Sequence, residues 1–392
     1  MAVNPLDDGV ADHYRDWSYP EPIQDLPGWL LNHWQWFDPS HAQMLFWPDR
    51  GQRSSLDILV AGCGANQAAV IAYTNPFARV VAIDVSEPSL DHHRLLKERY
   101  QLKNLECFHL PIEEVVALNR DFDLIISTGV LHHLADPELG LRRLADCLRP
   151  EGVIALMLYA RQGRLGVEMM QAVFRDLGLQ QDAAALFTVK EAIALLPAEH
   201  PLHSYLAVAP DLRFDAGLVD TFLHGRDRSY TVEDCLALVS AAGLVFQDWF
   251  LKTAYHPPSP PRGGFYRAVA ALPLRQRWST MERINTGNAC HFFMACRPER
   301  PISSYRIAME SEAVFDLVPH FRYRCRFEGR AIDGPGGRMD LSGDQQQLVS
   351  LIDGRRSIRE ILGRDAGAVD APGVALFRSL WQRDVLAMGL SV

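Results

Sequence analysis

Between residues 56 and 300, short apolar runs alternate with segments whose apolar residues recur at helical spacing. Five runs have the length and content of buried strands: Asp57–Ala61, Arg79–Asp84, Leu105–His109, Phe122–Ser127 and Gly152–Tyr159. We expect a helix to begin at Pro137, because Asp136 suits an N-cap and proline suits the first helical position. Strands that alternate with helices predict an α/β domain, in which a parallel sheet is covered by helices on both faces.

The alternation stops at Arg161 and does not resume until after Ser229. An amphipathic segment and an alanine-rich one fill this interval, which predicts a helical insertion after the fifth strand. Thr231-Val232-Glu233-Asp234 resembles a capping box, and Gly243 suits the end of the helix that follows it. Two further strands complete a predicted seven-stranded, mostly parallel sheet, the last of them antiparallel and at its edge: Leu244–Leu251 and His291–Cys296.

The two ends of the chain differ in character from this middle part. Five of the eight tryptophans lie in the first fifty residues, which either pack their rings on the main domain or form a lid over a ligand. After residue 300, a capping box at Ser357–Glu360 and a later helix with one apolar face predict a small separate α+β domain. The expected division is an aromatic segment over 1–50, a main domain over 51–299 with its insertion at 161–230, and a small domain over 300–392.

Composition narrows the class of protein. Apolar residues make up 48% of the 392 residues, enough for large cores, and no run approaches the roughly 20 apolar residues that span a bilayer. The net charge of −9 argues against a nucleic-acid backbone as the main partner. The seven cysteines are scattered without a C-x-x-C pair, which argues against disulfides and zinc and fits a reducing cytosol. The acidic N-terminus has no secretory signal, so we expect a cytoplasmic protein.

Candidate chemistry begins at the end of the first strand, where Gly62-Cys63-Gly64-Ala65-Asn66 opens a helix. Glycine there permits a tight turn and the close approach of a ligand to backbone N–H groups. Asp84 ends the second strand 22 residues after Gly62, where an acid accepts hydrogen bonds from both hydroxyls of a ribose. The pattern predicts a nucleotide-containing cofactor but does not identify it, and a helix-capping role is the alternative for Asp84.

The run after the fourth strand separates the candidate cofactors. Ser127-Thr128-Gly129-Val130-Leu131-His132-His133-Leu134, followed by Leu148-Arg149-Pro150-Glu151-Gly152, stands at the spacing of class I methyltransferases. The chain closely resembles that family from Leu56 to Arg297, apart from the insertion. The resemblance implies a Rossmann-like fold, S-adenosylmethionine as cofactor, and in-line methyl transfer to an unidentified acceptor, either a small molecule or a peptide. This run and the missing third loop glycine disfavour a nicotinamide-dependent oxidoreductase.

The resemblance also assigns the cofactor to the loop after strand one, the acid after strand two and the loops after strands three and four. The corresponding residues are Gly62, Cys63, Gly64, Asn66, Gln67, Asp84, Val85, Pro111, Ile112, Thr128, Gly129 and His133. Asn66 replaces the family's third loop glycine, and asparagine tolerates a positive φ better than most residues. The family's frequent acid near the adenine amino group is absent, with Glu113 as the nearest substitute.

On the acceptor side, a dense polar cluster runs from His224 to Tyr230 at the expected carboxyl edge of the sheet, where ligands bind in such folds. A general base is needed only if the acceptor must lose a proton, and the candidate catalytic residues are His224, Tyr230 and His132. Arg226 and Arg228 are candidates to bind a carboxylate or phosphate of the acceptor. Tyr14 and Tyr19 are further candidate substrate residues, since the aromatic faces of Tyr14, Trp17 or Tyr19 would stabilise the sulfonium.

Within that cluster, Asp227 would orient His224 or an arginine; alternatively, it pairs with an arginine only to hold the loop in place. For His132 and His133 the alternative to catalysis is a structural role. The sequence predicts no metal.

The last domain resembles, more faintly, the small winged-helix domains of the PqqD type, which hold leader peptides. The residues that carry this resemblance are Leu351–Ile358 and a helix that ends near Gly389-Leu390. It implies a peptide or protein partner, whereas a domain that only packs or dimerises is the alternative. A non-catalytic module that binds S-adenosylmethionine and docks a peptide through this domain is the rival to a methyltransferase.

Overall fold

The computed structural model describes residues 21–51, 53, 55–363 and 367–390, which form two compact units. Among the described residues, the first unit comprises 21–37, 55–246 and 285–298, and the second comprises 38–51, 53, 247–284, 299–363 and 367–390. These groupings differ from the division expected at residues 50 and 300, because two stretches from the middle and start of the chain belong with the C-terminal residues. Hydrogen bonds explain this: Gln247 donates to the carbonyl of Phe46, and the carboxylate of Asp384 accepts from the backbone N–H of Lys252.

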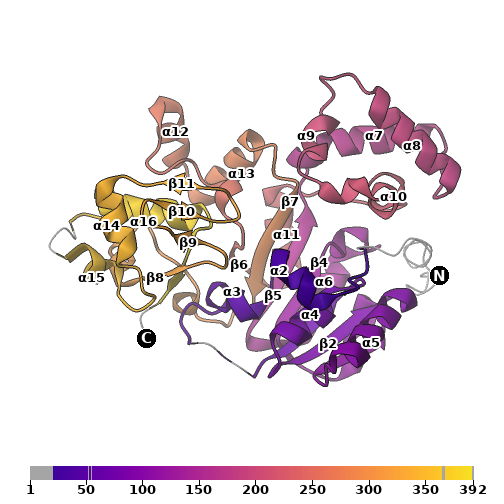
Figure 1. The fold of residues 1–392 in the computed structure, drawn as a ribbon, viewed down its shortest axis with the longest axis horizontal. Coiled ribbons are helices and arrows are strands. Elements are labelled where there is room, and N and C mark those ends of the chain that lie inside the picture. Colours follow the sequence, from indigo (N-terminus) through magenta and orange to yellow (C-terminus); the bar gives the residue numbers. More distant parts are fainter. Residues whose placement is uncertain (1–20, 52, 54, 364–366, 391–392) are drawn as a thin grey trace. The chain divides into compact units, whose positions relative to one another are not determined.

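A seven-stranded sheet with the order β3-β2-β1-β4-β5-β7-β6 is the central feature of the fold (Figure 1). Strands β1 to β5 are parallel, and β7 pairs antiparallel with β5, as predicted. One expectation is wrong: β7 lies between β5 and β6, so β6 and not β7 ends the sheet. The strands are β1 Asp57–Ala61, β2 Arg79–Asp84, β3 Leu105–His109, β4 Phe122–Thr128, β5 Leu148–Tyr159, β6 Val245–Trp249 and β7 Cys290–Cys296.

Helices follow the strands at the predicted places, and their starts carry the predicted caps. The carboxylate of Asp136 accepts a hydrogen bond from the backbone N–H of Leu139, and Thr231 with Asp234 forms a capping box. Gly243 has φ +75° and follows the end of α11. The helices of this region are α2 Leu26–Asn32, α4 Gln67–Thr74, α5 Glu87–Tyr100, η2 Ile112–Leu118, η3 Leu131–His133, α6 Pro137–Asp146 and α11 Val232–Ala241.

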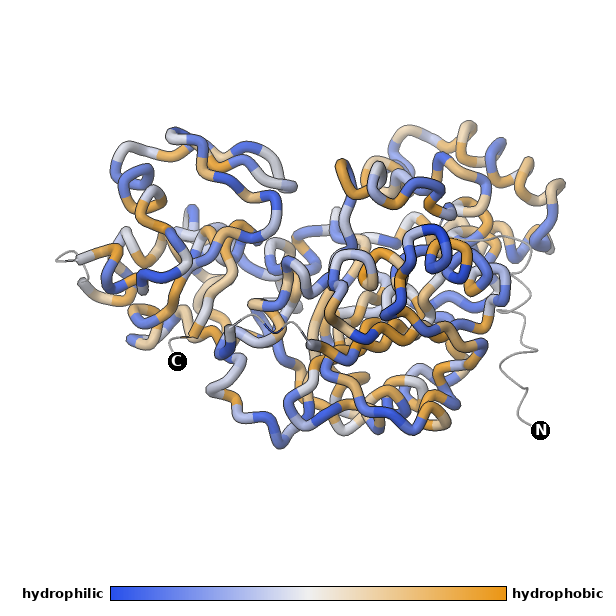
Figure 2. The backbone as a smooth tube through the Cα atoms, turned by 60° about the horizontal axis from the view of Figure 1, so that its bottom comes forward, coloured by the Kyte–Doolittle hydropathy of each residue, from blue (hydrophilic) through white to orange (hydrophobic). Residues whose placement is uncertain are grey.

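The predicted insertion after β5 is helical and has an apolar core of its own. Phe174, Val189, Leu202 and Phe222 are among the buried residues of this core. Figure 1 shows the insertion helices grouped together, and Figure 2 shows hydrophobic and hydrophilic residues alternating along them at the upper right. They are η4 Gln162–Arg164, α7 Leu165–Asp176, α8 Ala183–Leu195, α9 Leu202–Leu206, η5 Pro210–Arg213 and α10 Asp215–Leu223.

Most of the second unit is a mixed α and β structure around a separate core that includes Phe315, Ile358, Phe377 and Leu380. Its strands form a three-stranded sheet and a two-stranded sheet: β9 Arg326–Phe327, β10 Ala331–Asp333 and β11 Met339–Asp340, and β8 Val318–Phe321 with β12 Leu386–Gly389. Its helices are α3 Pro39–Phe46, η6 Thr253–Tyr255, α12 Gly263–Ala270, α13 Leu274–Ile284, η7 Ile302–Ser304, η8 Glu312–Asp316, α14 Gly343–Ser350, α15 Ile358–Leu362 and α16 Pro372–Gln382.

Residues 21–37 of the aromatic N-terminal segment pack within the first unit. The rings of Trp36 and Phe37 lie 5.4 and 5.8 Å from the ring of Phe292 on β7. Tyr14, Trp17 and Tyr19 lie outside the described residues, so their expected role stays a prediction. Among the helices of the described residues, none has the length and apolar content needed to cross a membrane.

Candidate active site

A tight turn connects β1 to α4, and glycine is required in it. Gly62 and Gly64 have φ values of +69° and +52°, in the left-handed region. The backbone N–H groups of Gly62 and Cys63 donate to the carbonyl of Ile83, at 2.9 and 3.1 Å. A Cβ atom on Gly62 would lie 2.4 Å from the side chain of Val130, so the turn packs directly against the run that follows β4.

Asp84 at the end of β2 closes this turn from the other side. Its two carboxylate oxygens accept hydrogen bonds from the backbone N–H groups of Gly64 and Ser86, each at 2.9 Å. Burial raises the pKa of Asp84 above its ordinary value, while these two N–H groups act in the opposite direction. Each carboxylate oxygen keeps a further lone pair, so the buried group fits a ligand that offers two hydroxyls.

A side-chain hydrogen bond joins the loops after β1 and β4. The amide nitrogen of Gln67 donates to the hydroxyl of Thr128 at 3.1 Å. Gly129, next in the chain, has φ +75°. The structure therefore brings together four predicted cofactor positions, Gly62, Gly64, Gln67 and Thr128, at the carboxyl ends of two neighbouring strands.

Asn66 does not adopt the positive φ that would suit a glycine position. Its φ is −131°, so tolerance of a positive φ does not explain an asparagine where the family has glycine. Instead, its side-chain oxygen accepts from the backbone N–H of Ile23, and its nitrogen donates to the carbonyl of Glu21, both at 2.8 Å. Asn66 thus ties the N-terminal segment to the start of α4, a role that the local sequence pattern does not reveal.

The loops after β2 and β3 meet where the adenine is predicted to lie. His109 contacts the carbonyl of Val85 at 3.0 Å, and the backbone N–H of Leu110 donates to the carbonyl of Asp84. Val85 is half-buried, whereas Pro111 and Ile112 are buried. Their adenine contacts stay a prediction.

Beyond β4, the ring of His224 meets those of His132 and His133, although about ninety residues separate them in the sequence. The ring of His133 lies 4.2 Å from that of His132 and 4.0 Å from that of His224. His132 stacks on Tyr159, the last residue of β5, at 3.9 Å. Burial lowers the pKa of His132 well below its ordinary value, and His133 and Arg164 add to the shift. The His224–Tyr230 segment therefore contacts the run after β4, at the carboxyl edge of the sheet.

A buried arginine that the sequence analysis did not single out organises this region. Arg164 is fully buried, donates to the carboxylate of Asp227 at 2.8 Å and to the hydroxyl of Tyr205 at 2.7 Å, and lies 3.6 Å over the ring of Tyr159. Gln171 also donates to Asp227, at 2.8 Å. The partners of Asp227 are thus from the insertion. Because Arg164 lies in no recognisable motif, the sequence alone did not predict its ion pair with Asp227.

The two arginines of the 224–230 segment donate to backbone carbonyls beyond β4. Arg226 donates to the carbonyl of His133 at 3.4 Å, and Arg228 to that of Ala135 at 3.2 Å. Tyr230 pairs with the backbone just beyond β5, beside Ala160: its N–H donates to the carbonyl of Tyr159 and its carbonyl accepts from the N–H of Arg161, both at 2.8 Å. Burial raises the pKa of the Tyr230 hydroxyl to about 12.

A cleft of about 580 Å³ lies between the insertion and the helices α6 and α11. Asp227 and Tyr230 line it, together with charged residues of both signs: Glu138, Glu168, Asp234, Arg161, Arg175 and Arg228. The cleft lies at the carboxyl edge of the sheet, because α6 follows the end of β4 and Arg161, another lining residue, follows the end of β5.

The part of the chain that contains the glycine turn after β1 is similar to known proteins. Residues 59–154 match the family model described as a methyltransferase domain. The chain therefore contains a stretch that is similar to methyltransferase domains. Its fold agrees with that of PKMT2 from Rickettsia typhi, solved alone and with AdoHcy: the first structure matches with a TM-score of 0.64 at 14% identity, over 90% of this chain and 75% of that one.

Two sequence relatives show how much of the chain is similar to other proteins. An uncharacterized protein of Synechococcus is 32% identical over 250 residues, 61% of this chain and 58% of that protein. The tRNA 5-carboxymethoxyuridine methyltransferase of Escherichia coli is also 32% identical, over 121 residues, 30% of this chain and 46% of that enzyme. This chain therefore spans about half the length of these relatives. The predicted resemblance to class I methyltransferases and the Rossmann-like fold are confirmed, whereas the PqqD-type resemblance of the last domain stays a prediction.

Proposed function

We propose that the chain transfers a methyl group from S-adenosylmethionine to an acceptor. The observation that carries this proposal is the glycine turn held by Asp84 beside Thr128, inside a methyltransferase domain. Asp84 would accept hydrogen bonds from the ribose hydroxyls, and the turn would present its backbone to the cofactor. The relatives and the AdoHcy-bound fold neighbour support the choice of cofactor.

The bound cofactor supplies an activated methyl group on a sulfonium. The residues of the chain then have to hold the cofactor and the acceptor in line and exclude water. Such alignment can lower the activation free energy by as much as about 7–11 kcal/mol. Thr128 and Gly129 would line the methionine portion. Gln67 fixes the hydroxyl of Thr128 and so keeps the loops after β1 and β4 in register.

We assign the acceptor to the cleft beside Asp227 and Tyr230. Acids and arginines line it together, so the cleft is not the cationic surface that a nucleic-acid backbone requires, and a nucleic-acid acceptor is disfavoured. A polar small molecule or a peptide fits the mixture of charges. The C-terminal part of the chain would hold a peptide or protein partner, and the seven free cysteines support a cytoplasmic location.

Among the candidate catalytic residues, hydrogen bonds separate the roles. The Nδ1 atom of His224 accepts from the backbone N–H of Arg226 at 3.0 Å, so in the neutral ring the proton sits on Nε2. His224 thus offers a donor and no base on that side. Tyr230, with its raised pKa, is likewise a hydrogen-bond donor at neutral pH. We therefore propose that Tyr230, which lines the cleft, orients the acceptor, and that His224 holds the backbone of Arg226 in place.

Calorimetric titration with S-adenosylhomocysteine and with NAD tests the cofactor. We expect binding of the first and none of the second; the reverse would overturn the proposal. Transfer is tested by incubating the chain with isotopically labelled S-adenosylmethionine and cell extract, and reading the labelled acceptor by mass spectrometry. S-adenosylhomocysteine binding without any labelled acceptor in repeated extracts would favour the non-catalytic module.

To test the acceptor side, Tyr230→Phe should lower turnover while the Kd for S-adenosylhomocysteine and the Tm stay near those of the unmodified chain. A matched control is Tyr266→Phe on α12. If Tyr230→Phe keeps full turnover, the tyrosine has only a packing role.

A further inference from the structure

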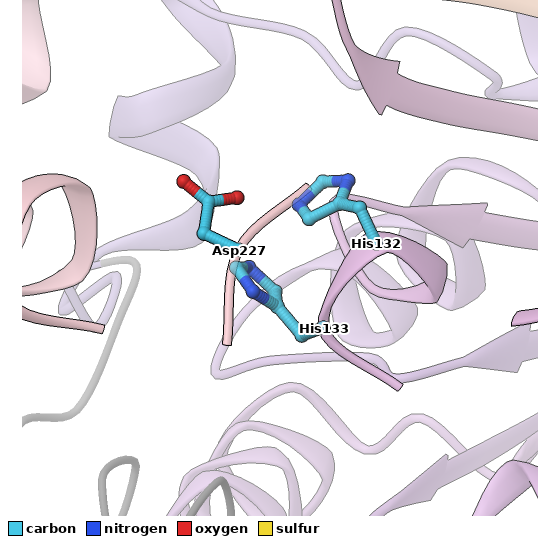
Figure 3. Close-up of side chains that lie close together, drawn as sticks. All are labelled: His132, His133 and Asp227. Atoms are coloured by element: carbon cyan, nitrogen blue, oxygen red, sulfur yellow. The ribbon is translucent and has the colours of Figure 1, made fainter. Parts of the chain in front are cut away.

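Three potential ligand atoms converge behind the cleft. One atom from each of His132, His133 and Asp227 can be chosen so that all lie within 4.8 Å of one another (Figure 3). Metal–nitrogen and metal–oxygen bonds are roughly 2.0–2.2 Å long, so ligands of one small cation lie about 3–4 Å apart. Small side-chain movements would bring the three atoms to that spacing.

We propose that His132, His133 and Asp227 form a binding site for a divalent transition-metal cation of the Zn²⁺ type. Two imidazoles and one carboxylate suit Zn²⁺, Fe²⁺ or Co²⁺, whereas Mg²⁺ and Ca²⁺ prefer oxygen ligands throughout. Nothing in the methyltransferase domain requires this site, and the sequence analysis predicted no metal.

His132 gives the first independent support. It is fully buried, and neither ring nitrogen has a hydrogen-bond partner among the described residues. A buried polar group left without a partner costs about 1–3 kcal/mol, so such a nitrogen calls for a ligand. Stacking on Tyr159 fixes the plane of the ring.

The hydrogen bonds of His133 and Asp227 prepare their remaining atoms as ligands. The carbonyl of Arg226 lies 2.8 Å from Nδ1 of His133; a carbonyl only accepts, so this nitrogen carries the proton and Nε2 carries the lone pair. Ligand histidines commonly donate their other N–H to a carbonyl in this way. In Asp227, Oδ2 accepts from Arg164 and Gln171, and the buried Oδ1 has no partner among the described residues.

The same reasoning excludes His224 from the ligand set, since its Nδ1 lone pair is used by Arg226 and its Nε2 carries the proton. Access is from the cleft, because Asp227 is one of its lining residues. The charge of Arg164 offsets that of Asp227, so a bound divalent cation leaves excess positive charge. The fourth position therefore favours an anion; resting on the proposed function, we assign that place to a deprotonated acceptor or to hydroxide.

Metal binding by the full-length chain, freed of metal with a chelator, tests the site directly. We expect calorimetry to show one equivalent of Zn²⁺ bound, and Co²⁺ to give visible absorption bands of a site with imidazole ligands. His132→Phe keeps the ring that stacks on Tyr159 and removes both nitrogens, so it should weaken Zn²⁺ binding at least tenfold. Asp227→Asn should weaken it as well, and His33→Ala, at an exposed histidine, should not.

The Kd for S-adenosylhomocysteine, measured on every variant, reports whether the domain is folded and whether the proposed function stands. Absence of Zn²⁺ and Co²⁺ binding by the unmodified chain, with S-adenosylhomocysteine still bound, would overturn the metal site alone. Unchanged Zn²⁺ affinity in either folded variant would overturn it too. If His132→Phe does not fold, the Zn²⁺ affinities of Asp227→Asn and of the unmodified chain decide whether the metal site exists.

Discussion

Replacing Asp84 with alanine tests the cofactor site most directly. In the proposed complex its carboxylate accepts from the ribose hydroxyls in addition to the N–H groups of Gly64 and Ser86. Hydrogen bonds to a charged acceptor contribute about 1.5–3 kcal/mol, so their loss should weaken S-adenosylhomocysteine binding by roughly ten- to a hundredfold. Asp84→Asn should not restore affinity, because an amide NH₂ group would face the N–H of either Gly64 or Ser86.

Isothermal titration calorimetry of both Asp84 variants gives the Kd values, and thermal unfolding without ligand checks that the domain is intact. Asp91→Ala is the matched control, because Asp91 is an exposed aspartate on α5, the helix that begins just after Asp84. A Kd for Asp84→Ala equal to that of the unmodified chain, in a folded protein, would place the ribose elsewhere and refute the reasoning.

Two substitutions and one titration test the glycine turn, the buried pair of Arg164 and Asp227, and the charge of Asp84. Gly62→Ala forces a positive φ on alanine and a Cβ atom into Val130, so it should lower both S-adenosylhomocysteine affinity and Tm, as calorimetry and thermal unfolding would show; unchanged values would contradict it. Arg164→Met leaves the carboxylate of Asp227 buried without its cation and should cost about 3–5 kcal/mol in the free energy of unfolding, measured in urea; a change within error would count against a stabilising pair. Because burial raises the pKa of Asp84, protonation removes the ionised, ribose-binding form at a higher pH than for an ordinary aspartate. The Kd measured from about pH 7 down to about pH 4 should therefore rise on acidification in the unmodified chain and stay flat in Asp84→Ala.

The strands could be predicted because each is marked by its own residues. The first four apolar runs match β1 to β4 with at most one residue of difference, since a buried strand needs apolar side chains whatever surrounds it. Strand order at the far edge was not readable in the same way. Nothing within Cys290–Cys296 tells that this strand inserts beside β5 and leaves β6 at the edge, because that depends on a pairing between distant segments.

The cofactor half and the acceptor half of the site differ in how far their contacts reach along the chain. The groups predicted to hold the cofactor stand at strand ends, and a parallel sheet brings those ends together, so position in the sequence implies position in space. The hydrogen bonds of the histidine region join residues that are far apart in the sequence. His133 and Arg226 are 93 residues apart, and Arg164 and Asp227 are 63 residues apart. Those contacts depend on how the insertion folds back after β5.

This difference also predicts which residues determine specificity for the acceptor. Every charged group that lines the cleft, apart from Glu138 and Asp234, comes from the insertion or from the segment that closes it. The turn at Gly62, by contrast, contacts Ile83, Asp84 and Val130, all within the sheet and its loops. In the proposed acceptor site, changes in the insertion would therefore alter the charges that meet the acceptor without disturbing the hydrogen bonds of Asp84. Selection for a new acceptor would act on residues 161–230 while the cofactor turn stays as it is.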